Sequence, residues 1–420
     1  MKRFKVFTLS TLAAAAVSLA QVAQSTDVEV LHWWTTAGQA KAVAELKIAL
    51  ENQGYGWKDF AVTGGGGQNA MTVLKSRVVA GDPPTAAMMK APLIYEWAEE
   101  GLVTDIHQVA IDEKWDELLP PMVQEIMTRD GKYIGAPVNI HRINWMRVNP
   151  KVMQDAGVEV PETWDEFFEV AEVLQANGVI PLAHGGQNWQ ELTLFEPVML
   201  GVGGADFYRK VFVDFDVDAI NSETMVEVLD TFKRLKAYTD KNAPGRTWNL
   251  TTAMVMRGEA AMQIMGDWVK GEFSAAGMTA PEEYLCVPAP GTGDGFVFTV
   301  DSFGMFKQKD EAELEGQQAL AAAIMSHDFQ RLFNLAKGSI PVRLDVDMNE
   351  FDSCAQGSSA DLASSGENGT IVPSLAHRSA AGPTARGAMI DLISQFWNDD
   401  NLSSADAQAK LADAAARLSS

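Results

Sequence analysis

The chain has 420 residues, with 33 lysines and arginines against 56 aspartates and glutamates, so its net charge at pH 7 is −23. This acidic excess excludes a protein built to bind nucleic acid or an anionic membrane surface, and it favours a neutral or cationic ligand. The length exceeds that of one hydrophobic core, so we expect two lobes.

The first 20 residues have the composition of a secretory signal peptide. Lys2, Arg3 and Lys5 form a basic start, residues 6–19 are mostly apolar, and small residues precede a cleavage site that we place after Ala20. The apolar stretch is too short for a stable membrane span. We therefore expect export to the periplasm, where loss of the signal leaves 30 basic against 56 acidic side chains and a net charge near −26.

Strands and helices alternate in the region that follows. The spacing of apolar residues predicts helices over 38–53 and 69–80. A short buried strand is expected over 85–89, followed by another helix through Trp97. This order is typical of parallel βαβ units, which bind ligands at the carboxyl ends of their strands.

Three large polar or aromatic side chains come just after such strand ends. Trp33 and Trp34 follow the apolar run 28–31, and Lys90 follows the strand over 85–89. We therefore expect them to line one cleft. Neighbouring side chains in extended backbone point to opposite faces, so one tryptophan should face the ligand while the other packs beneath it. The sequence leaves open which one does so.

The second lobe is expected to begin near Pro137. Helices are predicted over 162–177, 223–239 and 253–263, the first of them between a proline and a glycine that mark its ends. Residues 356–370 are polar and rich in glycine and serine, which predicts an exposed loop.

The sequence carries no strong catalytic motif. Glycines 64–67 precede a helix but lack the Lys-Ser/Thr of a phosphate-binding loop, so we interpret them as a flexible turn near the cleft. GxSxG and HExxH are absent. A glycosidase needs only two carboxylates across a cleft, so an exported carbohydrate-active enzyme stays an alternative.

Neither a metal site nor a cofactor is expected. The two cysteines, Cys286 and Cys354, are far apart in the sequence and have no CxxC spacing or nearby histidine cluster. In an oxidising compartment they have the chemistry to form one disulfide, but their spacing does not decide whether they do.

Tryptophan use points to carbohydrate. The chain has 11 tryptophans and 6 tyrosines, and Trp248 and Trp268 stand beside polar residues or glycine, outside the apolar faces of helices. Packing in a core or between lobes is the alternative for each of them. Flat indole faces suit the apolar C–H faces of a pyranose, while polar groups around them fix its hydroxyls.

From end to end, the chain after the signal resembles the periplasmic sugar-binding proteins of ABC importers, and most closely their glucose-binding subgroup. The segments that carry the resemblance include LHWWTTAGQAKAV, PETWDEF, MGDW, PAPGTGDGFVFTVDSFGMF and KGSIPVR. The PxTWDEF segment is shared across many carbohydrate-binding relatives. The double tryptophan, MGDW and KGSIPVR are more specific for the glucose-type subgroup.

The resemblance implies a two-lobed α/β periplasmic-binding-protein fold of the class II kind, with a ligand cleft between the lobes and hinge crossovers. We expect lobe 1 to comprise residues 27–135 plus about 290–330. Lobe 2 is expected to comprise residues 136–289 plus about 331–420.

The resemblance also implies a set of sugar-binding residues. The expected site consists of stacking tryptophans from both lobes and of polar side chains that bind hydroxyls: Trp33, Trp34, Gln39, Lys90, Trp248, Trp268, Asp301, Lys337 and His377. Gln39 departs from the acid typical of relatives, which would change the hydroxyl that is read. The alternatives are a helix cap for Lys337, a turn cap for Asp301 and a structural histidine for His377.

The function implied is that of a monomeric periplasmic receptor. It would bind glucose, or else galactose or mannose, and deliver it to an inner-membrane permease. The alternatives are the exported enzyme and a binding protein that serves a sugar chemosensor.

Overall fold

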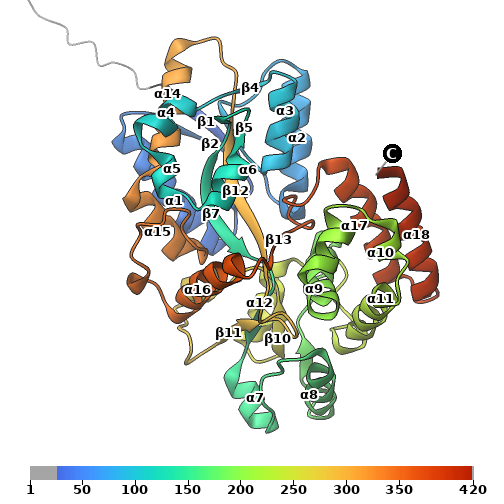
Figure 1. Ribbon diagram of the computed structural model, residues 1–420. Coiled ribbons are helices and arrows are strands. Elements are labelled where there is room, and N and C mark those ends of the chain that lie inside the picture. Colours follow the sequence, from blue (N-terminus) through green and yellow to red (C-terminus); the bar gives the residue numbers. More distant parts are fainter. Residues whose placement is uncertain (1–25, 419–420) are drawn as a thin grey trace, which may run out of the picture.

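Residues 26–418 of the computed structural model form two lobes, each built around its own β-sheet (Figure 1). The two-lobed α/β fold expected from the sequence is confirmed. The signal peptide expected over residues 1–20 lies outside the described residues.

The first lobe contains a seven-stranded sheet in the order β13-β12-β3-β1-β2, with β4 and β7 also paired to β12. β1 pairs in parallel with β2 and β3, which confirms the parallel βαβ units predicted for this part of the chain. β12 runs antiparallel to β3 and β7. The strands are β1 (Asp27–His32), β2 (Gly56–Ala61), β3 (Ala86–Met89), β4 (Val103–Thr104), β7 (Ala136–Arg142), β12 (Phe296–Phe306) and β13 (Ile371–Pro373).

Helices cover this sheet and bury apolar faces against it. α1 directs Leu46 and Leu50 into the core and packs against α14 and α15. The helices predicted over 38–53 and 69–80 are confirmed. The helices are α1 (Ala37–Asn52), α2 (Gln68–Val79), α3 (Ala91–Glu99), α4 (His107–Asp112), α5 (Trp115–Leu118), α6 (Pro121–Met127), α14 (Glu311–Met325) and α15 (His327–Lys337), and a small hairpin of β5 (Thr128–Arg129) and β6 (Lys132–Tyr133) lies beside them.

The second lobe contains a four-stranded sheet in the order β11-β8-β10-β9. Its strands are β8 (Trp145–Val148), β9 (Ile180–Leu182), β10 (Ala260–Ile264) and β11 (Leu285–Pro288). The helices around it are α7 (Pro150–Ala156), α8 (Trp164–Ala176), α9 (Asn188–Phe212), α10 (Val217–Ile220), α11 (Glu223–Leu235), α12 (Trp248–Met256), α13 (Val269–Ala275), α17 (Pro383–Asn398) and α18 (Ser404–Leu418).

α8 illustrates how local sequence sets these elements. Thr163 caps the helix in a reciprocal capping box with Glu166, which satisfies backbone donors at the first turn. Trp164, Phe167 and Leu174 then repeat at helical spacing and are buried in the core of the second lobe. The helix predicted over 162–177 is confirmed within two residues of each end.

The chain crosses between the lobes after β7, before β12 and again after β13, and these crossings correct two expected lobe limits. β7 pairs with β12 in the first sheet, so the first lobe extends to residue 142 and does not stop at 135. α15 packs on α1, and Phe333 belongs to the first core, so the limit expected near 330 falls inside a helix of the first lobe. The β7–β12 pairing and this apolar helix face were not visible in the local pattern.

Two further expectations are wrong. The helix predicted over 253–263 ends at Met256, because Gly258 turns the chain at a φ of 70°, and the following Ala260–Ile264 forms the buried strand β10. A short apolar run is compatible with either a helix or a strand, and here pairing with two neighbouring strands makes it a strand. Residues 356–370, expected as a loop, lie mainly in α16 (Ser353–Glu367), which Asp352 caps.

The structure settles the cysteine pairing that the sequence left open. Cys286 of β11 and Cys354 of α16 form a disulfide, with their Cα atoms 5.6 Å apart. The bond attaches α16 to the second sheet beside the crossings between the lobes.

Candidate functional site

A pocket lies between the two lobes, with about 820 Å³ of empty space that includes solvent at its mouth. All nine side chains expected to bind sugar line it. The rest of the lining comes from loops and strands of both lobes: Thr35, Thr36, Thr63, Gly64, Gly66, Gly67, Met88, His141, Gln187, Trp189, Thr247, Asn249, Thr299 and Arg378. The turn at glycines 64–67 thus lies at the pocket, as the sequence indicated.

The two neighbouring tryptophans after β1 have different environments. Trp34 is only 2 % exposed, and its ring packs on Phe333 at 5.2 Å and edge-on to Phe303 at 5.8 Å. Trp33 is half-buried and lies against the backbone at Gly67. Trp33 therefore offers the more accessible indole face, while Trp34 supports the floor of the pocket.

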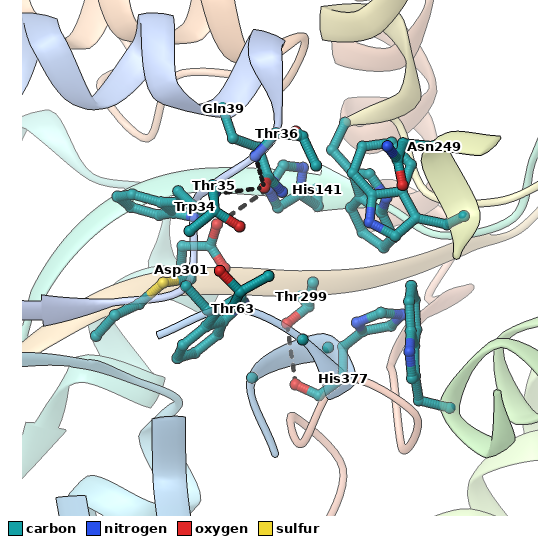
Figure 2. A pocket seen from close by; sticks show the side chains of 18 of the residues that line it. Trp34, Thr35, Thr36, Gln39, Thr63, His141, Asn249, Thr299, Asp301 and His377 are labelled. Carbon is teal, nitrogen blue, oxygen red and sulfur yellow. Dashed lines mark hydrogen bonds and ion pairs between the residues drawn. The ribbon is translucent and has the colours of Figure 1, made fainter. Parts of the chain in front are cut away.

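Polar side chains fix the loop that carries this pair. The backbone N–H of Trp34 donates to Nδ1 of His32 at 3.2 Å, so Nε2 carries the proton and donates to Asp59 at 2.8 Å. Oε1 of Gln39 accepts from the backbone N–H groups of Thr35 (3.2 Å) and Thr36 (3.4 Å), as Figure 2 shows. Only the NH₂ group of Gln39 is then left for a ligand, so this side chain is a donor.

Lys90 and Asp301 form an ion pair at the floor. Lys90 comes directly after β3, and Asp301 lies in β12, which pairs with β3. Nζ of Lys90 also donates to the carbonyl of Val300 at 3.0 Å. Burial alone would raise the pKa of Asp301, but the charges of Lys90 and His141 hold it well below its usual value, so the carboxylate is ionised.

His141 of β7 connects the two lobes beneath the pocket. Its Nδ1 faces the carboxylate of Asp267, which only accepts, so Nδ1 carries a proton. Its Nε2 lies 3.0 Å from Asp301, from Nζ of Lys337 and from the amide of Asn139. Both oxygens of Asp301 therefore contact protein groups, and each keeps a second lone pair for a ligand hydroxyl.

Lys337, the last residue of α15, is 2 % exposed and makes no ion pair within 4 Å among residues 26–418. Burial lowers its pKa to about 8. Its ammonium lies 5.9 Å from the ring centres of both Trp34 and Trp268. The lysine thus places a positively charged donor between aromatic rings of the two lobes.

Aromatic rings of the second lobe form the opposite wall. The Trp268 ring lies edge-on to His141 at 5.2 Å and to His377 at 4.8 Å. The Trp189 ring is also edge-on to His377, with ring centres 5.9 Å apart. Trp248, which is 9 % exposed, begins α12 and completes the wall.

His377 is neutral, because burial and the charge of Lys90 hold its pKa well below the usual value. The hydroxyl of Thr193 donates to the carbonyl of Trp189, so Nε2 of His377, 3.0 Å away, donates to that hydroxyl. The Nδ1 atom is left as an acceptor. Figure 2 shows His377 beside Thr299 at the edge of the cavity.

A buried carboxylate holds the loop that carries His377. Glu196 of α9 accepts hydrogen bonds from the backbone N–H of Leu375 (2.5 Å) and Ala376 (2.9 Å) and from the hydroxyl of Ser374 (2.8 Å). Burial raises the pKa of Glu196 to about 7. The second lobe thus presents residues 374–378 to the pocket on a fixed support.

The sequence missed several residues that the fold brings here. His141 stands in a strand that is buried throughout, so no local pattern distinguished it. Trp189 stands in a segment rich in polar residues, Gln187-Asn188-Trp189-Gln190, which is the signal that identified Trp248 and Trp268. Arg378 follows His377 directly and lines the pocket beside it.

The arrangement suits non-covalent binding of a polar ring. Indole faces alternate with donors and acceptors that the protein already holds in place, and both oxygens of Asp301 already contact protein groups. Among residues 26–418, His, Cys, Asp and Glu side chains form no group of three that could bind a metal ion. No helix within that range is long and apolar enough to span a membrane.

Comparisons with known proteins show the family to which the chain belongs. A family model described as bacterial extracellular solute-binding protein matches residues 36–327. A probable sugar-binding periplasmic protein of Brucella melitensis is 42 % identical over 414 residues, covering 98 % of each chain. A protein of the same description from Mesorhizobium japonicum is 42 % identical over 402 residues and 96 % of each chain.

Solved structures show a similar architecture. The bacterial solute receptor AcbH, described as having an exclusive preference for β-D-galactopyranose, superimposes with a TM-score of 0.79 at 20 % identity. The match covers 94 % of this chain and 100 % of the receptor. At this identity, the likeness establishes the fold.

Proposed function

Because the chain belongs to the bacterial extracellular solute-binding proteins, we propose that it binds one monosaccharide, with glucose as the first candidate, between its two lobes. The family expected from the sequence, the periplasmic sugar-binding proteins of ABC importers, is confirmed, whereas its glucose-binding subgroup stays a prediction. The chain is the sugar-binding component of an ABC importer and not an enzyme, so the carbohydrate-active enzyme is set aside.

One observation carries the choice of ligand. Indole rings from both lobes, Trp33 on one side and Trp189, Trp248 and Trp268 on the other, surround buried hydrogen-bonding groups. A pyranose has apolar faces for such rings and hydroxyls at its edge for the polar groups.

Each expected site residue then has a proposed role. Trp33, Trp248 and Trp268 stack on the sugar, and Trp34 supports Trp33 from beneath. The ammonium of Lys337 and the amide of Gln39 donate to hydroxyls, whereas Nδ1 of His377 accepts. Lys90 and Asp301 bind hydroxyls as a pair whose charges the protein already balances.

Closure of the two lobes around the sugar would create the surface that an inner-membrane permease recognises. We propose that the chain acts as a monomer in the periplasm after cleavage near Ala20. Deletion of the gene should then abolish uptake of the sugar, whereas a role confined to chemosensing predicts unchanged uptake.

The proposal is tested by titrating ligand-stripped protein with monosaccharides. Trp268→Ala and Trp248→Ala should each weaken binding by about 1–3 kcal/mol through lost stacking and burial. Trp97→Ala is the matched control, since Trp97 packs on Phe306 in the first lobe and does not line the pocket. If both pocket variants bind as tightly as the control, the aromatic walls do not hold the sugar.

A further inference from the structure

The glycines at 64–67 lie between tryptophans of the two lobes. Gly66 and Gly67 have φ angles of 55° and 88°, a backbone conformation that other residues rarely adopt. A Cβ atom on Gly66 would lie 3.0 Å from the indole of Trp189, and one on Gly67 would lie 2.8 Å from that of Trp33. Trp189 belongs to the second lobe and Trp33 to the first, so this turn closes the space between them.

Arg378 holds the turn from the second lobe. Its guanidinium donates to the carbonyl of Gly66 at 2.9 Å and to Oε1 of Gln68 at 3.1 Å. The side chain is 8 % exposed, and no carboxylate within residues 26–418 forms an ion pair with it. A buried guanidinium without a carboxylate is costly, so these two acceptors from the opposite lobe supply much of its stabilisation.

The backbone conformation of Arg378 also supports a functional role for this residue. Its φ of 63° places a residue with a long side chain in the left-handed region, which costs free energy unless the surroundings impose it. The preceding residues are held by Glu196, so the strain is maintained by a rigid support. Strained backbone of this kind gathers at sites of function.

We propose that Arg378 is a positioning residue that latches the turn at residues 64–67 across the cleft and so sets the rate at which the ligand leaves. The two hydrogen bonds join groups of opposite lobes, so they exist only while the lobes are closed. Breaking them is then part of every opening, and their loss accelerates release without slowing entry. The inference rests on the proposed function only in that a sugar is the ligand.

The test compares dissociation rates by stopped-flow tryptophan fluorescence, using the monosaccharide that titration shows to bind. Arg378→Met should raise the dissociation rate about tenfold or more and change the association rate by less than about threefold. Arg378→Lys, which keeps the charge and one donor, should restore part of the slow release. An unchanged dissociation rate in a folded Arg378→Met variant overturns the proposal.

Substitutions at two glycines test whether Arg378 acts through the latch or through direct contact with the sugar. Gly66→Ala should raise the dissociation rate as Arg378→Met does, and the double variant should add little to either. The matched control is Gly81→Ala, which has a φ of 76° but no atom within 4 Å of the added methyl group, so it carries the same strain away from the cleft. Fully additive effects of the two latch substitutions, or equal effects of Gly66→Ala and Gly81→Ala, contradict the latch.

Hydrogen exchange tests the latch without a ligand. Without ligand, the parent molecules whose lobes are closed keep the two hydrogen bonds, and Arg378→Met should reduce their share. The variant should therefore speed amide exchange in peptides covering residues 62–71, while peptides from α8 exchange as in the parent. Equal exchange in parent and variant overturns the latch. If the parent binds no sugar but its exchange responds in this way, the proposed function fails and the latch stands.

Discussion

Lys90 and Asp301 pair beneath the pocket although 211 residues separate them in the sequence, and each side chain is only 5 % exposed. The pairing of β3 with β12 brings them together. Because the second carboxylate oxygen faces His141, Asp301 supports both the floor of the site and the charge balance of the first lobe. Its replacement should therefore affect stability as well as binding.

Asp301→Asn should lower the free energy of unfolding by about 3 kcal/mol, since it leaves the buried ammonium of Lys90 without its counter-charge. Urea denaturation measures this loss. Asp59→Asn is the control, because Asp59 is 55 % exposed and its pair with His32 should contribute less than about 1 kcal/mol. Equal stability of Asp301→Asn and the parent contradicts the account of the floor.

The same variant tests contact with the sugar. The new NH₂ group faces a hydroxyl that the carboxylate accepted from, at a cost of roughly 1–3 kcal/mol. For a sugar analogue without that hydroxyl, Asp301→Asn should reduce the binding free energy by less. Titration against a set of deoxyglucoses should show discrimination collapsing at one ring position, whereas equal losses for all analogues would make Asp301 purely structural.

The adjacent tryptophans should separate binding from stability. Trp34→Ala should cost about 3–5 kcal/mol of unfolding free energy, because the ring is buried against Phe303 and Phe333. Trp33→Ala should cost less stability but weaken sugar binding by about 1–3 kcal/mol. Denaturation and titration of the two variants give both numbers, and the reverse order would mean that Trp34 is the stacking residue.

Lys337 should make stability depend on pH in the alkaline range. Burial lowers its pKa in the folded protein from 10.5 to about 8, so between these values the unfolded chain binds the extra proton. The free energy of unfolding therefore rises with pH from about 8 to about 10.5 by up to about 3 kcal/mol from this group. Lys337→Met removes this contribution, so between about pH 8 and about pH 10.5 the free energy of unfolding of the parent should rise relative to that of the variant. A difference between the two free energies that stays constant over this range contradicts the lowered pKa of Lys337.

The disulfide between Cys286 and Cys354 should stabilise the protein by restricting its unfolded chain. It spans 68 residues, and the entropy of such a loop predicts roughly 4 kcal/mol. Urea denaturation of the parent and of the Cys286→Ser/Cys354→Ser double variant tests this. Identical midpoints would mean that the bond adds no stability.

The local sequence predicted those helices and strands whose ends and apolar faces are marked by their own residues and immediate neighbours. The helix at 164–176 has its own capping residues and apolar face, and the strand at 86–89 is bounded by prolines and a helix cap. Ala260–Ile264 had no such signal, since a short apolar run becomes a strand only when two neighbours pair with it. α16 was missed because its small polar residues indicate a loop, although a capping aspartate and a disulfide hold it as a helix.

The residues of the site also fall into two groups, those that the local sequence predicted and those that only the fold brings to the pocket. Trp33, Lys90 and Trp268 were predicted from the sequence because each follows a predicted strand or stands beside polar residues or glycine. His141 and Arg378 were not, because their positions at the pocket depend on pairing across the crossings and on the anchoring of residues 374–378. The sequence also left open which tryptophan faces the cavity, since that depends on the aromatic rings packed beneath Trp34.

Calorimetric titration of refolded, ligand-stripped protein with glucose, galactose, mannose, xylose and maltose tests the central claim most directly. The account predicts that a monosaccharide, glucose first, binds one molecule per chain with a dissociation constant of about 1 μM or lower. The Trp268→Ala variant should bind it more weakly, and a chelator should leave the affinity unchanged. Binding of maltose alone, or of none of these sugars by protein with native circular dichroism, would contradict it.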